Sequence, residues 1–510
     1  MKNFGQATAP GAATTAESAG EQSSLALIIV QSTSQPHRVG EVAFFPPGEP
    51  LFVGRGDGEA ERFACFARQV PGEVFAVDPV EGLLGGESLS RRQLEVRSTG
   101  DALEVAWIRG CRTYFNGQEG TRATLRPGDT VRLRGEAVLL CVSRPRELPA
   151  LQTRREIHPL GEPDRDGIVG EGPAVWRSRD ELERAARGQN DVLIEGESGT
   201  GKEMAAAVIH RRSSRARGPF VSRNASTISP TLIASELFGN PAGYPNPGMP
   251  ARKGLVGTAD KGTLFLDEIG DCSLDVQAQL LRVMDDGECQ AVGEAVSRQV
   301  DVRFVGATNR DESVFRSDFH ARFLTRVRLP PLRERREDIP LLARHFLLEY
   351  AKECTRSLEP RERDELYERL FRPGLGGRLE PKLSDRFIDE LLRLPLPGNA
   401  RDLQRLVIQA AEASHGEELR LPATATGATA TKAAPTKAAT TAKTATPLER
   451  SPRDGAQDSG RPGTPSKEEI LACLEREEGK VARAARRLGV DRNALYRLMK
   501  SYGIDRGPQE

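Results

Sequence analysis

Residues 191–203 read DVLIEGESGTGKE, and this stretch decides the fold of the central part of the chain. The apolar residues 192–194 predict a buried strand, and the run KEMAAAVIHR that starts at Lys202 predicts a helix. The turn between them has the pattern Gly-x-x-x-x-Gly-Lys, in which glycines let backbone N–H groups curl around phosphate oxygens. The helix N-terminus and the lysine add positive charge. The predicted phosphate-binding loop comprises Gly196, Glu197, Ser198, Gly199, Thr200, Gly201 and Lys202.

Two points qualify this P-loop. The next residue is Glu203, so the Ser or Thr hydroxyl that usually holds Mg²⁺ is missing. The alternative interpretation is a glycine-rich strand–helix turn that binds nothing.

The composition restricts the class of protein. A chain of 510 residues predicts three or four domains. The 73 basic and 73 acidic residues balance, so the net charge does not indicate binding to nucleic acid or membranes. The seven cysteines are scattered without a CxxC pair, which argues against a disulfide framework or a zinc site and favours a reducing compartment. No segment resembles a signal peptide or a membrane span, so we expect a cytoplasmic protein without a membrane partner.

The N-terminal region changes character after a predicted disordered tail at 1–22. Short β-type runs separated by Gly, Pro and Asp fill residues 23–145 and predict an all-β sandwich. Its loops carry an arginine, a serine hydroxyl and an asparagine amide, which together suit a phosphate held on a peptide. The alternative is a sandwich used only for packing within the chain. The loop residues are Gly54, Arg55, Ser90, Arg91, Arg92, Gln93, Asn116 and Gly117.

After a predicted linker at 146–166, strand-like runs end in polar residues. The run at 262–268 ends in Asp267 and Glu268, and the run at 302–309 ends in Asn309. Around a P-loop, alternating strands and helices predict a doubly wound α/β sheet. There Asp267 would lie on the Mg²⁺ side of the γ-phosphate and Glu268 could polarise the attacking water; the alternative is a solvated strand end.

Further along, Arg316 and Arg322 precede a proline-rich break and a helical segment at about 331–416. Arginines in this position commonly act on the nucleotide of a neighbouring subunit, which predicts a homo-oligomer. Ordinary surface charge is the alternative.

The C-terminal region begins with an Ala/Thr/Lys/Pro-rich linker at 417–465, which cannot form a core. Residues 466–506 predict an all-α unit with a helix–turn–helix, with a turn at Gly489. Basic residues are concentrated there, as binding to a DNA backbone requires; a solvated helical hairpin is the alternative.

The N-terminal region resembles a forkhead-associated (FHA) domain, a reader of phosphothreonine peptides. The resemblance rests on Gly54-Arg55, Ser90-Arg91 and Asn116-Gly117. It implies that Arg55 and Ser90 contact phosphate, Arg91 the phosphate or peptide, and Asn116 the peptide backbone. Gln93 stands where the family has a scaffolding histidine. The implied partner is a phosphothreonine protein, with a Ser/Thr kinase among the candidates.

Residues 167–416 resemble the AAA+ domain of bacterial enhancer-binding proteins, the activators of sigma-54 RNA polymerase. The shared strings are GESGTGKE, SELFG, GTLFLDEIG, QLLRV, ATNRD, PPLRERREDIP and PGNARDL, and Glu203 is the family's residue after the lysine. The resemblance implies ATP with Mg²⁺ as cofactors, a hexameric ring and an α-helical lid. By position, Lys202 is the Walker A lysine, Asp267 and Glu268 the Walker B pair, Asn224 the residue that couples nucleotide state to that glutamate, Asn309 sensor I, Arg316 and Arg322 the arginine fingers, and Arg401 sensor II.

The tail resembles the Fis-type helix–turn–helix of the same proteins, which implies upstream DNA sites as a partner. Four residues would then face the major groove and Lys500 would meet phosphate. The four are Arg492, Asn493, Tyr496 and Arg497.

Two departures from the family pattern leave two hypotheses about the function. The family's sigma-54-contacting GAFTGA loop is replaced by GYPNPG at 243–248, and the segment between Asn309 and Phe315 is about one and a half helical turns short. One hypothesis is a sigma-54 activator, an ATPase driven by phosphothreonine input. The other is a DNA-binding regulator or repressor that keeps nucleotide binding and oligomerisation but does not engage sigma-54.

Overall fold

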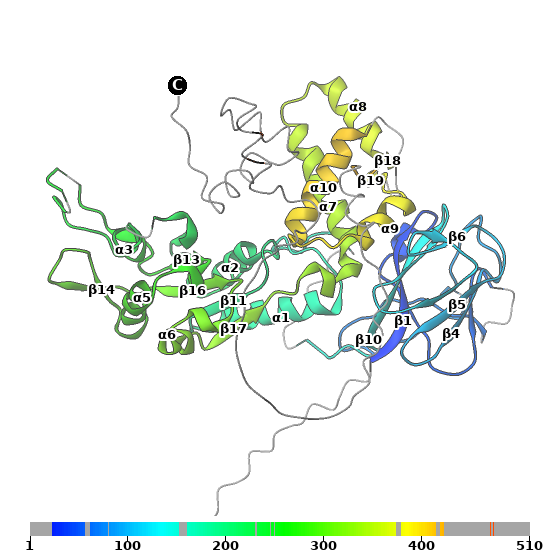
Figure 1. The fold of residues 1–510 in the computed structure, drawn as a ribbon, viewed down its shortest axis with the longest axis horizontal. Helices are drawn as coiled ribbons and strands as arrows, with labels where there is room; N and C mark the ends of the chain where they lie inside the picture. The colour runs from blue at the N-terminus through cyan, green and yellow to red at the C-terminus, as the bar shows by residue number, and fades with distance from the viewer. Residues whose placement is uncertain are drawn as a thin grey trace, which may run out of the picture. The chain divides into compact units, whose positions relative to one another are not determined.

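The computed structural model describes residues 23–56, 62–79, 81–151, 161–229, 232–244, 246–248, 250–373, 379–414 and 419–422, together with Ile470 and Cys473. The chain divides into two compact units at residues 432 and 433. The first contains an N-terminal pair of sheets, a central parallel sheet and a group of helices, each coloured by position in Figure 1. The predicted DNA-contacting residues 492–500 lie outside the described residues, so their roles stay predictions.

The N-terminal region is built from antiparallel strands in two sheets. One sheet has the order β2-β1-β10-β9-β6-β7 and the other the order β3-β4-β5-β8. Their bounds are β1 Ser23–Ser32, β2 Val42–Phe44, β3 Leu51–Val53, β4 Leu94–Ser98, β5 Leu103–Trp107, β6 Thr113–Phe115, β7 Gln118–Glu119, β8 Arg122–Leu125, β9 Thr130–Leu133 and β10 Ala137–Pro145.

Strand β1 is apolar on both of its faces. Leu25, Leu27 and Ile29 pack in the core between the two sheets. The alternating residues Ala26, Ile28 and Val30 belong to a second core that they share with helices of residues 339–413. Since a strand with one face in solvent would alternate apolar and polar residues, the continuous run LALIIV has its cause in this double burial.

The central sheet is parallel, with the order β12-β13-β16-β11-β17, and confirms the prediction of a doubly wound α/β domain. All five strands therefore end at the same edge, where the P-loop follows β11. The bounds are β11 Val192–Glu195, β12 Phe220–Asn224, β13 Thr263–Asp267, β16 Arg303–Thr308 and β17 Thr325–Arg328, with a separate hairpin of β14 Glu288–Gln290 and β15 Ser297–Gln299.

Helices cover both faces of this sheet. One face packs on α1 and α2 through residues such as Ile194, Phe265 and Val305. The other packs on α3 to α6 through Leu193, Leu264 and Phe304. The bounds are α1 Pro173–Arg187, α2 Lys202–Arg211, α3 Ile233–Phe238, α4 Gly254–Thr258, α5 Leu274–Asp286 and α6 Ser317–Arg322.

The predicted lid is mainly helical. It contains α7 Ile339–Cys354, α8 Pro360–Leu370, α9 Asp385–Arg393 and α10 Asn399–Ala413, with a small hairpin of β18 Phe371–Pro373 and β19 Leu379–Pro381. The turn before α10, Pro397-Gly398, brings its first residues onto the P-loop, since the Ala400 N–H donates to Gly199 O at 3.1 Å. Within the residues that the structure describes, no helix has the length and apolar character needed to cross a bilayer.

Candidate functional site

The P-loop has the backbone that its glycines predict. Gly199 and Gly201 have φ of 76° and 101°, and a Cβ on Gly199 would lie 2.2 Å from the Gly398 carbonyl oxygen. The buried Lys202 donates from Nζ to Gly196 O at 2.9 Å and to Glu197 O at 3.3 Å. The same Nζ lies 3.8 Å from Glu268 Oε1. The lysine charge is therefore placed between the loop and the end of β13.

Two carboxylates lie at the end of β13, where the sequence places them: Asp267 is its last residue and Glu268 follows it. Glu268 has a φ of 51°, a left-handed conformation that turns it from the strand direction toward Lys202. Burial raises the pKa of Glu268, and the nearby Lys202 and the backbone N–H of Asn309 oppose that rise. Asn309 therefore contacts Glu268 through its backbone N–H group.

Asn224 contacts the first of the two carboxylates, Asp267. Its Nδ2 donates to Asp267 Oδ2 at 3.5 Å, and its Oδ1 accepts from Ser226 N at 2.9 Å. The parallel pairing of β12 and β13 puts Asn224 opposite Asp267, which explains the partner. Direct coupling of Asn224 to Glu268 stays a prediction.

Lys202, Asp267 and Glu268 line a cavity of about 400 Å³, which we call the P-loop cleft. Its apolar lining residues are Ile168, Val169, Met204, Leu342 and Phe346. Its polar lining comprises P-loop residues between Ser198 and Glu203, both carboxylates, and the cations Arg335 and Arg401. A cavity lined by apolar side chains and by a cationic, glycine-rich loop suits a nucleotide, which has an apolar base and charged phosphates.

Several cleft residues were not identified from the sequence. Arg335 is buried, and burial lowers its pKa while the neighbouring Asp338 opposes the change. His345 lies in the same wall, and burial lowers its pKa also. The string PPLRERREDIP contains Arg335, but its position in the cleft is seen only in the structure.

The lid contacts the P-loop through the start of α10. Asn399, at a φ of 51°, donates from Nδ2 to Ser198 O at 2.9 Å and accepts from Leu332 N at 2.8 Å. Arg401 Nη1 donates to Ser198 Oγ at 3.1 Å. A movement of α10 therefore alters the phosphate loop directly.

Arg316 and Arg322 do not line the P-loop cleft. Arg316 pairs with Asp318 at 2.8 Å and Arg322 with Asp285 at 2.7 Å, and both side chains are about half exposed, at 40% and 45%. The shortened segment before them is a single 3-10 turn, Glu312–Val314. Their predicted action on a neighbouring subunit stays a prediction.

The GYPNPG loop is held at its base. Buried Asn240 exchanges backbone hydrogen bonds with Arg252, and its Nδ2 donates to the carbonyls of Pro241, Tyr244 and Pro250. Gly243 and Gly248 have φ of 79° and 92° with open space around them. The ring of Tyr244 lies against Gly293, in the turn of the β14–β15 hairpin.

The N-terminal loops that carry Arg55, Ser90 and Arg91 lie together. Arg55 N donates to Ser90 O at 3.1 Å, and a Cβ on Gly54 would lie 2.3 Å from Arg91 O, so this close approach requires glycine. Gln93, fully buried, accepts from Ser90 N at 3.2 Å and donates to Cys111 O at 2.9 Å. The glutamine therefore joins two loops.

Asn116 lies where the sandwich meets the lid. Its φ is 49°, its Nδ2 donates to Asp129 Oδ1 and its Oδ1 accepts from Thr130 N, both at 2.9 Å. Thr130 Oγ1 in turn donates to Asp389 Oδ1 of α9 at 2.5 Å, and burial raises the pKa of Asp389. Beside Asn116, a Cβ on Gly117 would lie 2.6 Å from the guanidinium carbon of Arg393. The predicted peptide-contacting loop is therefore in contact with a lid helix.

With this geometry in place, the chain can be compared with known proteins. Residues 168–333 match the sigma-54 interaction domain, and residues 466–502 match the Fis family of bacterial regulatory proteins. Over 361 residues the chain is 39% identical to the DNA-binding transcriptional regulator NtrC of Klebsiella pneumoniae, which covers 68% of this chain and 72% of that protein. The chain belongs to the NtrC-type family of sigma-54-dependent transcriptional activators.

Other relatives match smaller parts. The chain is 42% identical over 260 residues to the Nif-specific regulatory protein of Bradyrhizobium diazoefficiens, covering 50% of this chain and 41% of that one. Among solved structures, NtrX from Brucella abortus in complex with ATP is 30% identical, with a TM-score of 0.42 over 66% of this chain and 69% of that one.

Proposed function

We propose that this activator binds and hydrolyses ATP in the P-loop cleft and uses the cycle to control sigma-54 RNA polymerase from upstream DNA sites. The observation that carries the proposal is the joint placement of Lys202, Asp267 and Glu268 at one sheet edge, in a cleft of about 400 Å³. Its apolar side chains suit a base, and the N–H groups of its loop suit phosphates.

Each group has a role in this proposal. Lys202 and the loop N–H groups hold the β- and γ-phosphates. Glu268, with its raised pKa, takes up the proton of an attacking water. Arg316 and Arg322 approach the nucleotide of the next subunit in a hexameric ring, where they neutralise charge in the transition state.

Magnesium fits this donor set through the nucleotide. Among the described residues, no group of three or more His, Cys, Asp or Glu side chains could hold a metal ion by itself. Mg²⁺ is commonly bound through one or two carboxylates together with substrate phosphates. Asp267 is the carboxylate that would hold it, and the ion would neutralise phosphate charge.

We propose phosphothreonine sensing by an FHA domain as the input. Arg55, Ser90 and Arg91 supply a cationic and hydroxyl-bearing loop cluster that suits a phosphate, and the implied partner is a phosphorylated kinase or its substrate. Two contacts with α9 give this input a route to the nucleotide site: Gly117 lies beside Arg393, and Thr130, a partner of Asn116, donates to Asp389. The chain then passes from α9 to the α10 residues that contact Ser198.

A second function is favoured by the loop at 243–248. Three features oppose the movement that polymerase remodelling needs. They are the anchoring of the loop by Asn240, the packing of Tyr244 on Gly293, and the two prolines of the loop. In this alternative the chain regulates or represses without engaging sigma-54, and nucleotide binding serves ring assembly at the DNA. Arg492, Asn493, Tyr496, Arg497 and Lys500 would hold the DNA in either case.

Replacing the P-loop lysine tests the nucleotide site. In Lys202→Ala the phosphates lose their point charge, so we expect ATP turnover to fall by at least about 100-fold. Lys352→Ala, in which a lysine with a 64% exposed side chain is removed, is the matched control. Wild-type turnover in Lys202→Ala would remove the assignment of the site.

Replacing Arg55 tests the phosphopeptide site. Arg55→Ala should weaken binding of a phosphothreonine peptide about tenfold or more, because a charge-assisted hydrogen bond is lost, while ATP turnover is retained. Arg97→Ala, an exposed arginine of β4, and the unphosphorylated peptide are the controls, with affinity read by fluorescence anisotropy. Equal affinity for the Arg55 variant and the wild type would leave the sandwich as a packing module.

A further inference from the structure

A second cavity lies where the N-terminal sandwich meets the lid, and it is separate from the P-loop cleft. Its volume is about 450 Å³, and it shares no lining residue with the cleft. Val30 of β1 and Val39 contribute one wall, and Leu341 of α7 and Ile388 of α9 contribute the other. We call it the junction cavity. Its volume falls in the range of roughly 300–1,000 Å³ that is usual for small-molecule sites.

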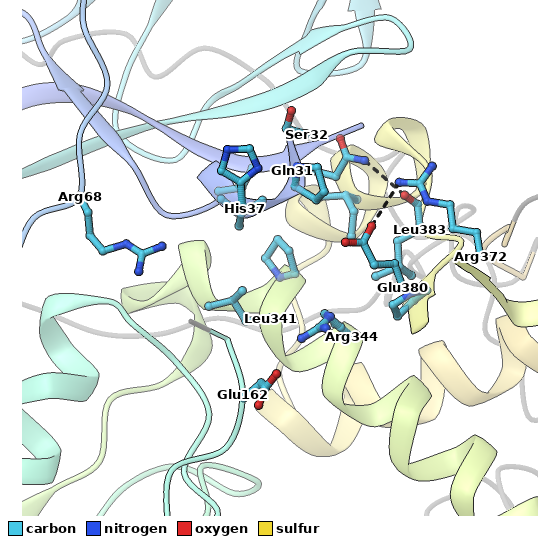
Figure 2. Close-up of a pocket in the computed structure, with 16 residues that line it drawn as sticks. Gln31, Ser32, His37, Arg68, Glu162, Leu341, Arg344, Arg372, Glu380 and Leu383 are labelled. Atoms are coloured by element: carbon cyan, nitrogen blue, oxygen red, sulfur yellow. Dashed lines mark hydrogen bonds and ion pairs between the residues drawn. The ribbon is translucent and has the colours of Figure 1, made fainter. Parts of the chain in front are cut away.

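The cavity walls are mostly apolar. Val30, Leu341 and Ile388 are buried, and Pro381 and Leu383 continue the surface on the lid side. Gln31 Nε2 donates to Leu383 O at 3.3 Å, which joins the two walls at one end (Figure 2). A ligand with an apolar body could displace water from these walls with a favourable free energy.

The charged lining residues have an excess of arginine. The lining contains Arg68, Arg344 and Arg372 against Glu162 and Glu380. Arg372 pairs with Glu380 at 3.8 Å. Among the described residues, neither Arg68 nor Arg344 has an ion pair, and Figure 2 shows Arg68 reaching in from the sandwich and Arg344 from α7. Two guanidinium groups with unused donors beside an apolar surface select for an anion.

We infer that the junction cavity binds a small amphipathic anion, a molecule with an apolar body and one acidic group. The apolar body lies against Val30, Leu341 and Ile388, and Arg68 and Arg344 supply the positive charge that attracts the acidic group. Because Val30 belongs to the sandwich and Leu341 and Ile388 belong to the lid, the bound molecule contacts both. It is therefore an effector site in addition to the nucleotide and phosphopeptide sites.

A pair of probes that differ in charge tests this inference on the full chain. The anionic dye 1-anilinonaphthalene-8-sulfonate and its neutral counterpart N-phenyl-1-naphthylamine share an apolar body. We expect saturable, single-site binding of the anionic dye by fluorescence titration, and weaker binding of the neutral one. Excess ADP with Mg²⁺ should not displace the dye, which separates this site from the P-loop cleft.

Variants then assign the site. Arg344→Gln and Arg68→Gln should each weaken the anionic dye about tenfold and change the neutral probe by less than about threefold, since only the charge-assisted contact is lost. Arg361→Gln, at a side chain that is 90% exposed, is the matched control and should change neither. Arg344→Lys should recover part of the anionic affinity. Thermal unfolding of each variant checks that the chain is folded.

Three outcomes would overturn the inference. The first is an absence of saturable dye binding to the wild type. The second is dye affinity in Arg68→Gln and Arg344→Gln equal to that of Arg361→Gln. The third is displacement of the dye by ADP.

Discussion

At the scale of single residues, Glu268 links the chemistry of the cleft to a strained backbone. A glutamate with a φ of 51° is uncommon, and this conformation brings its carboxylate to within 3.8 Å of the Lys202 ammonium group. Asp267, one residue earlier, continues the strand direction and contacts Asn224 instead. Adjacent carboxylates thereby have different surroundings and can have different roles.

The raised pKa of Glu268 predicts the pH dependence of ATP turnover. The base form is the active one, so turnover should fall as the pH drops through a pKa above the usual value of about 4.3 for glutamate. Glu268→Gln should lower kcat by at least about 100-fold, retain ATP binding and lose this acid limb. A pH–rate profile of both proteins is the measurement. An unchanged acid limb in the residual activity of the variant would assign the titration to another group.

Gln93 shows that the identity of a residue does not predict its hydrogen-bond partners. The FHA resemblance made its side chain look like a departure, since histidine is expected there. The structure gives both ends of the glutamine amide a partner, Ser90 N and Cys111 O, in a fully buried position. The sequence contained the residue but not its hydrogen bonds, which depend on two loops meeting.

At the scale of elements, the strand–loop–helix unit at 192–211 was predictable because its signal is local. Strand β1 was predictable as a strand, but the meaning of its unbroken apolar run was not. Its outer residues Ala26, Ile28 and Val30 are buried by lid helices that begin some 300 residues later in the sequence. The sequence did not predict that Arg335 and Phe346 line the cleft, for the same reason: their positions there depend on tertiary packing.

The start of α1 is held by a buried acid. Asp338 Oδ1 accepts from Glu171 N at 2.6 Å and Gly172 N at 2.9 Å. Burial, with a smaller effect of Glu337, raises the pKa of Asp338 to about 7. In the unfolded chain its pKa is about 3.9, so the native state holds the proton more tightly. The resulting stabilisation is complete below about pH 4 and is lost as the pH rises to about 7.

Asp338→Asn should remove this pH dependence while keeping an acceptor for both N–H groups. We expect the free energy of unfolding of the variant minus that of the wild type to increase by at least about 1.4 kcal/mol, the value of one pKa unit, between pH 5 and pH 8, because only the wild type loses stability over this range. Urea unfolding at both pH values measures it, with the exposed Asp101→Asn as control. A difference that is the same at pH 5 and pH 8 would contradict the assignment.

At the scale of the whole molecule, the described contacts join the sandwich to the lid and the lid to the nucleotide loop. The first set runs from Asn116 through Thr130 to Asp389 in α9, and the second joins Asn399 in α10 to Ser198. The family assignment came from contiguous strings, and the sequence could supply those. The contacts with the lid could not be predicted, because Thr130 and Asp389, and likewise Asn399 and Ser198, are far apart in the chain.

The central claim is that ATP turnover in this chain drives sigma-54 polymerase. The altered loop at 243–248 favours the opposite outcome, so the claim can be tested directly. Open-complex formation on a sigma-54 promoter, with purified protein, sigma-54 RNA polymerase and ATP, measures it most directly. The account predicts ATP-dependent open complexes with the wild type and none with Lys202→Ala. A wild-type protein that hydrolyses ATP and binds DNA but forms no open complex would contradict it and favour a regulator that acts without sigma-54.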